Sequence, residues 1–101
     1  MNEILYDQRV RTYINAFIHF GEEMQLVVAL EELSEVQKEI CKVMRGKTDL
    51  DNLAEEIADA TIMLEQVRLI FNLNDQVCQK MDEKVKRLDD KLKGDGLHEE
   101  R

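Results

Sequence analysis

Two short acidic clusters combine residue types and spacing that could do chemistry. Each pairs two carboxylates three positions apart: Glu32 with Glu35, and Glu56 with Asp59. Residues three apart share one face of a helix, so two such helices packed side by side would bring four carboxylates together. Like charges that close need compensation. A hard divalent cation such as Mg²⁺, which prefers oxygen ligands, would supply it.

The charge around these clusters keeps one sign over long stretches. No Lys or Arg lies between Arg11 and Lys38, and none lies between Lys47 and Arg68. A solvated helix face usually mixes both signs, because like-charge pairs four residues apart destabilise a helix by about 0.2–0.5 kcal/mol. Two such pairs stand in the clusters, Glu31 with Glu35 and Glu55 with Asp59. Their presence favours a cation site over a merely solvated face.

A basic stripe is expected on the last helix. Its members are spaced four, three and four residues apart: Lys80, Lys84, Arg87 and Lys91. Such a stripe can hold phosphate, although basic helix faces are often only solvated. Together with an acidic metal site, it indicates a metal-bound polyphosphate as the ligand.

Several other kinds of site are excluded by their missing residues. The chain has no Gly-rich phosphate loop and no calcium loop of the EF-hand type. A di-iron bundle would need Glu-x-x-His pairs, and neither His19 nor His98 belongs to one. The net charge of −8 argues against nucleic-acid binding, which needs a basic surface.

The elements that must position these side chains are helices. The chain has 101 residues, no proline, four glycines and 36% charged residues, which is typical of one helical domain. Apolar residues recur at helical spacing, and they predict helices over about residues 5–20, 22–44 and 75–92, with another that runs from the loop at 46–51 to about Phe71.

Turn residues mark the expected ends of these helices. Gly21 is expected to end the first helix, and residues 45–47 the second. Asn52 with Glu55 has the spacing of a capping box. The candidate caps are Asp49, Asp51 or Asn52 for the third helix and Asn74 for the fourth.

The predicted fold is therefore all-α: a four-helix bundle-like protomer over residues 1–93, followed by a loose polar tail over residues 94–101. A domain of this size covers its apolar surface poorly, and the apolar faces are wide for a small monomer. We therefore expect assembly into a dimer or a tetramer.

The expected compartment is the cytoplasm. No apolar run approaches the length of a membrane span, and the mixed charges near the N-terminus do not resemble a signal peptide. Cys41 and Cys78 have no near partner in the sequence, so we expect them to be reduced and partly buried.

Taken in order, the acidic clusters resemble those of the all-α nucleotide pyrophosphohydrolases of the MazG-like superfamily. That family carries Glu-Glu-x-x-Glu on one helix and Glu-x-x-Asp on the next. Residues 31–35 and 56–59 match these patterns, with twenty residues between them. The flanks also resemble small, phage-type members, over about residues 10–92 in all. The flanking matches are Phe20-Gly21 with Gln25-Leu26, Arg45-Gly46, and Lys84 with Arg87-Leu88.

The resemblance implies hydrolysis of a (deoxy)nucleoside triphosphate between its α- and β-phosphates, giving the monophosphate and pyrophosphate. It implies Mg²⁺ as the cofactor, with Mn²⁺ as a possible substitute. The ion would neutralise phosphate oxygens and lower the pKa of the attacking water. One or two ions would be held by Glu32, Glu35, Glu56 and Asp59.

The resemblance also suggests roles for other side chains. Either Glu31 or Glu35 would orient or deprotonate the attacking water. Lys84 and Arg87 would hold the β- and γ-phosphates, in their own chain's site or in a neighbour's. The base and sugar side would involve Gln25 and Phe20, the latter standing where such relatives often have Trp. The preferred base and sugar stay open.

Two other functions remain as alternatives. A non-catalytic, oligomeric helical interaction protein, with acidic faces that bind a basic partner, would explain the helices and their apolar stripes. It would not explain the like-charge pairs on successive helices. A family member that binds nucleotide without turnover is the other alternative. The expected partners are the triphosphate and further copies of the chain, without nucleic acid or membrane.

Overall fold

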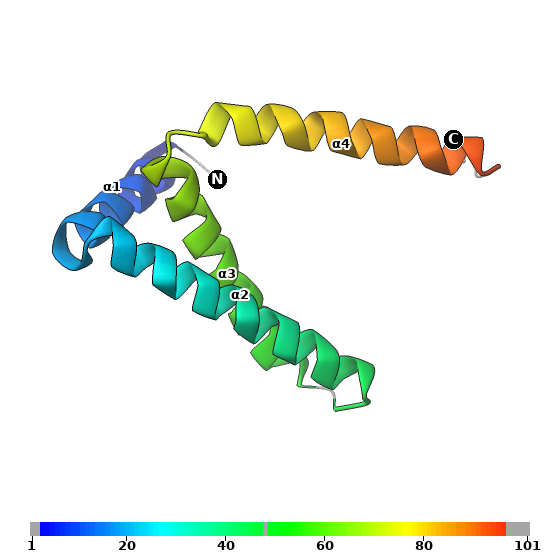
Figure 1. Ribbon diagram of the computed structural model, residues 1–101, viewed down its shortest axis with the longest axis horizontal. Coiled ribbons are helices and arrows are strands. Elements are labelled where there is room, and N and C mark those ends of the chain that lie inside the picture. The colour runs from blue at the N-terminus through cyan, green and yellow to red at the C-terminus, as the bar shows by residue number, and fades with distance from the viewer. Residues whose placement is uncertain (1–2, 48, 97–101) are drawn as a thin grey trace. The chain divides into compact units, whose positions relative to one another are not determined.

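The computed structural model describes residues 3–47 and 49–96, with side chains from Gln8 onward. The described residues lie in four helices or in the short connections between them, and none of them is in a strand (Figure 1). The helices are α1 (Glu3–Phe20), α2 (Glu22–Met44), α3 (Leu50–Ile70) and α4 (Asn74–Gly94). This confirms the prediction of an all-α chain with four helices.

The start of α3 is capped by the first of the three candidates. The Asn52 backbone N–H donates a hydrogen bond to Asp49 Oδ1 at 3.0 Å, which satisfies one of the amides left open at a helix N-terminus. The predicted capping box with Asn52 as the cap is wrong, because Asn52 lies inside the helix and its amide is the group being capped.

The start of α4 differs from the prediction by one residue. Asn74 is the first residue of the helix rather than its cap, and the Leu73 carbonyl accepts from the Val77 N–H at 2.8 Å. Asn72 has a φ of 54°, a left-handed conformation that Asn tolerates better than most residues. The chain therefore turns at Asn72, just after the C-cap of α3 at Phe71. As a result, α4 begins at Asn74, one residue before the predicted start at Asp75.

Glycines make the turns at both ends of α2. Gly21 separates α1 from α2 at a φ of 91°, and its N–H donates to the Phe17 carbonyl at 2.8 Å. Gly46, at a φ of 87°, follows the end of α2. Both turns confirm the predicted helix ends.

The core of the first three helices lies mainly between α2 and α3, which pack against each other. Its buried apolar side chains include Ala29, Ala60 and Met63. A polar pair lies among them, because the Gln25 amide Nε2 donates to Gln66 Oε1 at 2.8 Å, and both side chains are buried. This hydrogen bond links α2 directly to α3.

Tyr13 connects α1 to α3. Its side chain is buried, and its hydroxyl donates to the Glu65 carboxylate. Arg9, one helical turn earlier, lies 3.4 Å from the same carboxylate. Burial first, and then the hydrogen bond to Glu65, raise the pKa of Tyr13 above its ordinary value, so this hydroxyl keeps its proton.

The chain divides into two units after Phe71, with α1, α2 and α3 in one and α4 in the other. None of the described residues of α4 is buried. The packing of α4 in a bundle, and a domain over residues 1–93 with a tail over residues 94–101, stay predictions. Gly94 is the last residue of α4, and residues 97–101 lie outside the described part of the chain.

Several large apolar side chains and both cysteines lie on the surface. The exposed fraction is 69% at Leu30 and 81% at Met44, both on α2. Cys41 and Cys78 are exposed and form no disulfide, so the prediction that they are partly buried is wrong. Cys41 lines a groove formed by residues of α2 and its C-cap, Arg45. Cys78 belongs to α4, in which no described residue is buried. None of the described helices combines the length and apolarity needed to cross a membrane.

Candidate active site

An open pocket of about 620 Å³ lies between the middle of α2 and the first half of α3. Its lining is mostly acidic: Leu30, Glu31, Glu32, Ser34, Glu35, Glu56 and Asp59. The structure thus brings the four predicted metal ligands into one pocket. Their placement follows from the helical period, because residues three apart project from the same face, and α2 and α3 turn these two faces toward each other.

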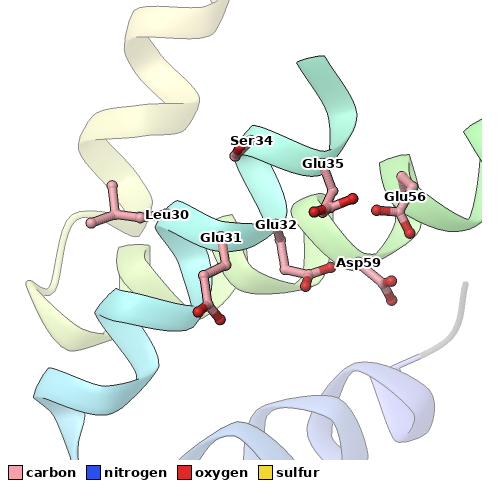
Figure 2. A pocket seen from close by; sticks show the side chains of 7 residues that line it. All are labelled: Leu30, Glu31, Glu32, Ser34, Glu35, Glu56 and Asp59. Carbon is pink, nitrogen blue, oxygen red and sulfur yellow. The ribbon is translucent and has the colours of Figure 1, made fainter. Parts of the chain in front are cut away.

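Figure 2 shows the carboxylates of the pocket in two pairs, each with one member from α2 and one from α3. Glu32 extends toward Asp59, and Glu35 extends toward Glu56. Glu31 points to another side, away from both pairs. The two pairs and Glu31 therefore have different surroundings within one pocket.

The Glu32 carboxyl group is unfavourably placed for a negative charge. Loss of solvent raises its pKa most, followed by the charges of Asp59 and Glu56, a hydrogen bond with Asp59, and the charge of Glu35. Each of these favours the protonated form. A proton or a cation at the Glu32 carboxyl group would relieve this repulsion.

Glu56 is in a similar situation on α3. Loss of solvent again raises its pKa most, and the charge of Glu35 is the next cause, followed by those of Asp59, Glu39 and Glu55. Glu56 therefore repels acidic neighbours on its own helix and on α2. A positive ion in the pocket would relieve both Glu32 and Glu56.

Glu39 is an acidic neighbour of this pocket that the sequence analysis missed. Its side chain is almost fully buried, with 4% exposed, and Lys42 Nζ lies 3.1 Å from its carboxylate. A hydrogen bond with Asn52, and then one with Lys42, lower its pKa. Glu39 thus stays charged beside Glu56. Its spacing of seven from Glu32 and four from Glu35 was the available signal, since these intervals also fall on one helix face.

The acidic donor set has the chemistry of a divalent-ion site but not yet its geometry. Among the described residues, no three His, Cys, Asp or Glu side chains converge closely enough to hold a metal ion as they stand. The four carboxylates instead lie in two pairs, Glu32 with Asp59 and Glu35 with Glu56 (Figure 2). Their chemistry fits Mg²⁺ or Mn²⁺, because carboxylate oxygens from rigid elements are the ligands these ions prefer. Binding would require the two pairs to converge.

The predicted base-side residues lie in contrasting surroundings. Phe20 is exposed at the end of α1, with its ring against His19 at an edge-to-face centroid distance of 4.6 Å. Gln25 is buried and hydrogen-bonded to Gln66, so its amide already has a partner inside the protein. Neither residue lines the acidic pocket.

The predicted phosphate ligands Lys84 and Arg87 are exposed on α4. They belong to the second unit, which begins at Asn72, and the acidic pocket belongs to the first. Their role toward phosphate therefore stays a prediction.

Comparison with known proteins yields no matching family model, curated protein or solved structure.

Proposed function

We propose that this protein is a Mg²⁺-dependent nucleotide pyrophosphohydrolase of the MazG-like kind. It would hydrolyse a (deoxy)nucleoside triphosphate between the α- and β-phosphates, releasing the monophosphate and pyrophosphate. The observation that carries the proposal is the pocket between α2 and α3, in which Glu32, Glu35, Glu56 and Asp59 gather from two helices.

The electrostatics of the pocket support a cation rather than a basic protein partner as its ligand. Glu32 and Glu56 both have a raised pKa, caused by lost solvent and by neighbouring carboxylates. A small divalent ion can approach four such oxygens at once, whereas a Lys or Arg side chain brings one charge on a long stem. The ion would in turn bind the phosphates of the substrate, neutralise their oxygens and lower the pKa of the attacking water.

Different roles are proposed for Glu35 and Glu31. Glu35 extends toward Glu56 (Figure 2), which suits a residue that helps to hold the ion. Glu31 lines the pocket but points away from both carboxylate pairs, so as the proposed base it would have to turn toward the ion to reach the attacking water. The two roles are separable, because Glu35→Gln should weaken Mg²⁺ affinity, whereas Glu31→Gln should lower kcat at unchanged Mg²⁺ affinity.

The remaining parts of the proposal rest on the sequence. Lys84 and Arg87 would stabilise the leaving pyrophosphate, because cations offset the charge that builds up on phosphate oxygens. The wide exposed apolar surface, with Leu30 and Met44 on α2 among its members, supports a homodimer or homotetramer. A cytoplasmic location, and the absence of nucleic-acid and membrane partners, also stay predictions.

A product assay tests the proposed reaction. The purified chain would be incubated with Mg²⁺ and a panel of ribo- and deoxynucleoside triphosphates, with pyrophosphate and orthophosphate detected separately. We expect pyrophosphate and the monophosphate, abolished by EDTA and by Glu56→Gln. The matched control is Glu55→Gln, which removes the neighbouring exposed carboxylate that does not line the pocket.

Other outcomes of the assay would contradict specific parts of the proposal. Orthophosphate with the diphosphate would keep the metal site but move the attack away from the α-phosphorus. Binding of a triphosphate without turnover would favour the non-catalytic relative. No products and no Mg²⁺ response would favour the helical interaction protein.

A further inference from the structure

Polar residues of α2 and α3 face each other in matched pairs along the contact between the two helices. From the N-terminal end of α2, the pairs are Gln25 with Gln66, Glu32 with Asp59, Glu35 with Glu56, and Glu39 with Asn52; Figure 2 shows the two in the middle. Steps of seven, three and four residues forward along α2 match equal steps backward along α3. Such steps are typical of the seam between two packed antiparallel helices. The four pairs therefore share one register.

Hydrogen-bonded pairs lie on either side of the carboxylate pairs. At one end, Gln25 Nε2 donates to Gln66 Oε1 at 2.8 Å, and at the other, the Glu39 carboxylate is hydrogen-bonded to Asn52. A polar contact in a helix seam fixes the register of the two helices, because a shift would leave buried polar groups without partners. The carboxylate pairs between these contacts repel each other when they are ionised. The seam is therefore held at its ends and pushed apart in its middle.

Glu39 is the one charged side chain among the described residues that is buried, with 4% exposed. A buried carboxylate is costly unless it is both paired and hydrogen-bonded. Lys42 Nζ, 3.1 Å away on the same helix, offsets its charge, and Asn52 supplies a hydrogen bond from α3. Glu39 thus already has partners for its carboxylate, which suits it to joining the two helices rather than to binding an ion.

We propose that Glu39 and Asn52 are positioning residues, whose hydrogen bond holds α2 and α3 close enough for the neighbouring carboxylates to converge on a small divalent ion. Glu39 follows Glu35 by four residues, and Asn52 precedes Glu56 by four. The hydrogen bond therefore lies about one helical turn from the Glu35–Glu56 pair, where it opposes the repulsion between these two side chains. The inference rests on the proposed function, because it requires that an ion binds in the acidic pocket.

The spacing of the helices should affect which ion the pocket prefers. Mg²⁺ requires ligands at about 2.0–2.1 Å in a nearly ideal octahedron, whereas Ca²⁺ accepts about 2.3–2.6 Å and irregular geometry. Without the Glu39–Asn52 hydrogen bond, repulsion between Glu35 and Glu56 would separate the helices at this end of the pocket. Mg²⁺ would then lose more affinity than Ca²⁺. A general loss of stability would instead weaken the binding of both ions alike.

Isothermal titration calorimetry of the full chain, with Mg²⁺ and with Ca²⁺, tests the inference. Asn52→Ala removes the hydrogen bond across the seam but keeps the Glu39–Lys42 ion pair, and Ala is favourable in the helix. We expect the Kd for Mg²⁺ to rise about tenfold, the lower end of the range for groups that orient metal ligands. The Kd for Ca²⁺ should rise less, so that the preference for Mg²⁺ over Ca²⁺ falls.

Two further variants separate position from charge and from stability. Glu39→Gln removes the charge but keeps an oxygen that can accept from Asn52, so both ions should bind more weakly while the preference for Mg²⁺ is kept. Gly21→Ala introduces strain at a turn that does not line the pocket, since Gly21 has a φ of 91°. It should leave the affinity for both ions unchanged.

The inference and the proposed function fail in distinguishable ways. An unchanged Kd for Mg²⁺ in Asn52→Ala, or equal rises for Mg²⁺ and Ca²⁺, would overturn the positioning role while leaving the metal site of the wild type in place. The same changes in Gly21→Ala would also overturn it, because they would follow from lost stability alone. No Mg²⁺ binding by the wild type would overturn both the proposed function and the inference.

Discussion

A negative charge on Glu32 or Glu56 is unfavourable in the folded chain, because loss of solvent and acidic neighbours raise the pKa of both carboxyl groups. A carboxyl group with a raised folded-state pKa binds its proton more tightly when folded. Its stabilising contribution is complete below its unfolded pKa of 4.5 and is lost as pH rises through the folded pKa. The free energy of unfolding should therefore depend on pH, and bound Mg²⁺ should remove this contribution.

In EDTA, we expect Glu32 and Glu56 to lower the free energy of unfolding as pH rises from about 4.5 toward neutrality. Glu39 acts in the opposite direction, because its pKa is lowered, so the useful comparison is with a variant rather than with an absolute slope. The free energies of unfolding in urea of the wild type and of the double variant Glu32→Gln/Glu56→Gln should diverge as pH rises, with the variant gaining relative stability. A difference in free energy that stays constant across this range would show that the pKa values of the two carboxyl groups are not raised.

Glu56→Gln should separate activity from stability. We expect turnover to fall at least about 100-fold, because even supporting residues of a metal site typically contribute 10–100-fold. Without Mg²⁺, the melting midpoint should stay equal or rise, since one repelling charge is gone. Circular dichroism melting and the pyrophosphate assay, with Glu55→Gln as control, measure both. Loss of helicity in Glu56→Gln would instead mean that Glu56 is structural.

Spacing alone could predict which carboxylates meet, but not the surroundings of every polar residue. Glu32, Glu35, Glu56 and Asp59 follow from the helical period and lie in one pocket. The burial of Gln25 could not be predicted from the sequence, because a single Gln gives no sign of a distant partner such as Gln66. The spacing of Glu39 from Glu32 and Glu35 placed it on the same helix face, but its hydrogen bond with Asn52 of the next helix could not be predicted from spacing.

At the scale of elements, the hydrogen bond between Gln25 and Gln66 joins α2 to α3 within the core. Gln25→Leu leaves the Gln66 oxygen without this donor, and an unsatisfied buried polar group costs about 1–3 kcal/mol. We expect denaturant unfolding to show this loss for the single variant, and substantial recovery for Gln25→Leu/Gln66→Leu. If the double variant recovers stability but loses turnover, Gln25 also contacts substrate. If the single variant loses no stability, the hydrogen bond does not contribute to the free energy of unfolding.

The turn between α1 and α2 depends on Gly21. Its φ of 91° and ψ of 146° are essentially restricted to glycine, and other residues there cost about 1–3 kcal/mol. Gly21→Ala should therefore lower the melting midpoint by several degrees. Gly94→Ala is the control, since Gly94 lies in a helix with open space around its Cα. Equal midpoints for the two variants would contradict this role of Gly21.

Apolar periodicity predicted the four helices, but the residues at which they begin and end were harder to predict. Gly21 and Gly46 gave clear signals because glycine tolerates positive φ. Near α4, Asn72 and Asn74 were both suitable for a turn, and the chain uses Asn72 in the left-handed region. Local sequence could not decide between them, because the choice depends on where α3 ends.

At the scale of the whole molecule, apolar surface exceeds what three packed helices cover. Leu30 and Met44 on α2 remain exposed. The sequence predicted wide apolar faces but could not say what covers them, because the same apolar periodicity serves contacts within a chain and between chains. The placement of Lys84 and Arg87 relative to the acidic pocket depends on the same question.

Thermal melting with and without Mg²⁺ tests most directly whether the pocket between α2 and α3 is a cation site. An ion that binds only the folded state stabilises it by mass action, by about 2.7 kcal/mol at 100 times its Kd. We predict that millimolar Mg²⁺ raises the midpoint of the wild type and of Glu55→Gln by several degrees, and that Glu56→Gln responds little. An unchanged wild-type midpoint, or an equal shift in all three proteins, would contradict the metal site.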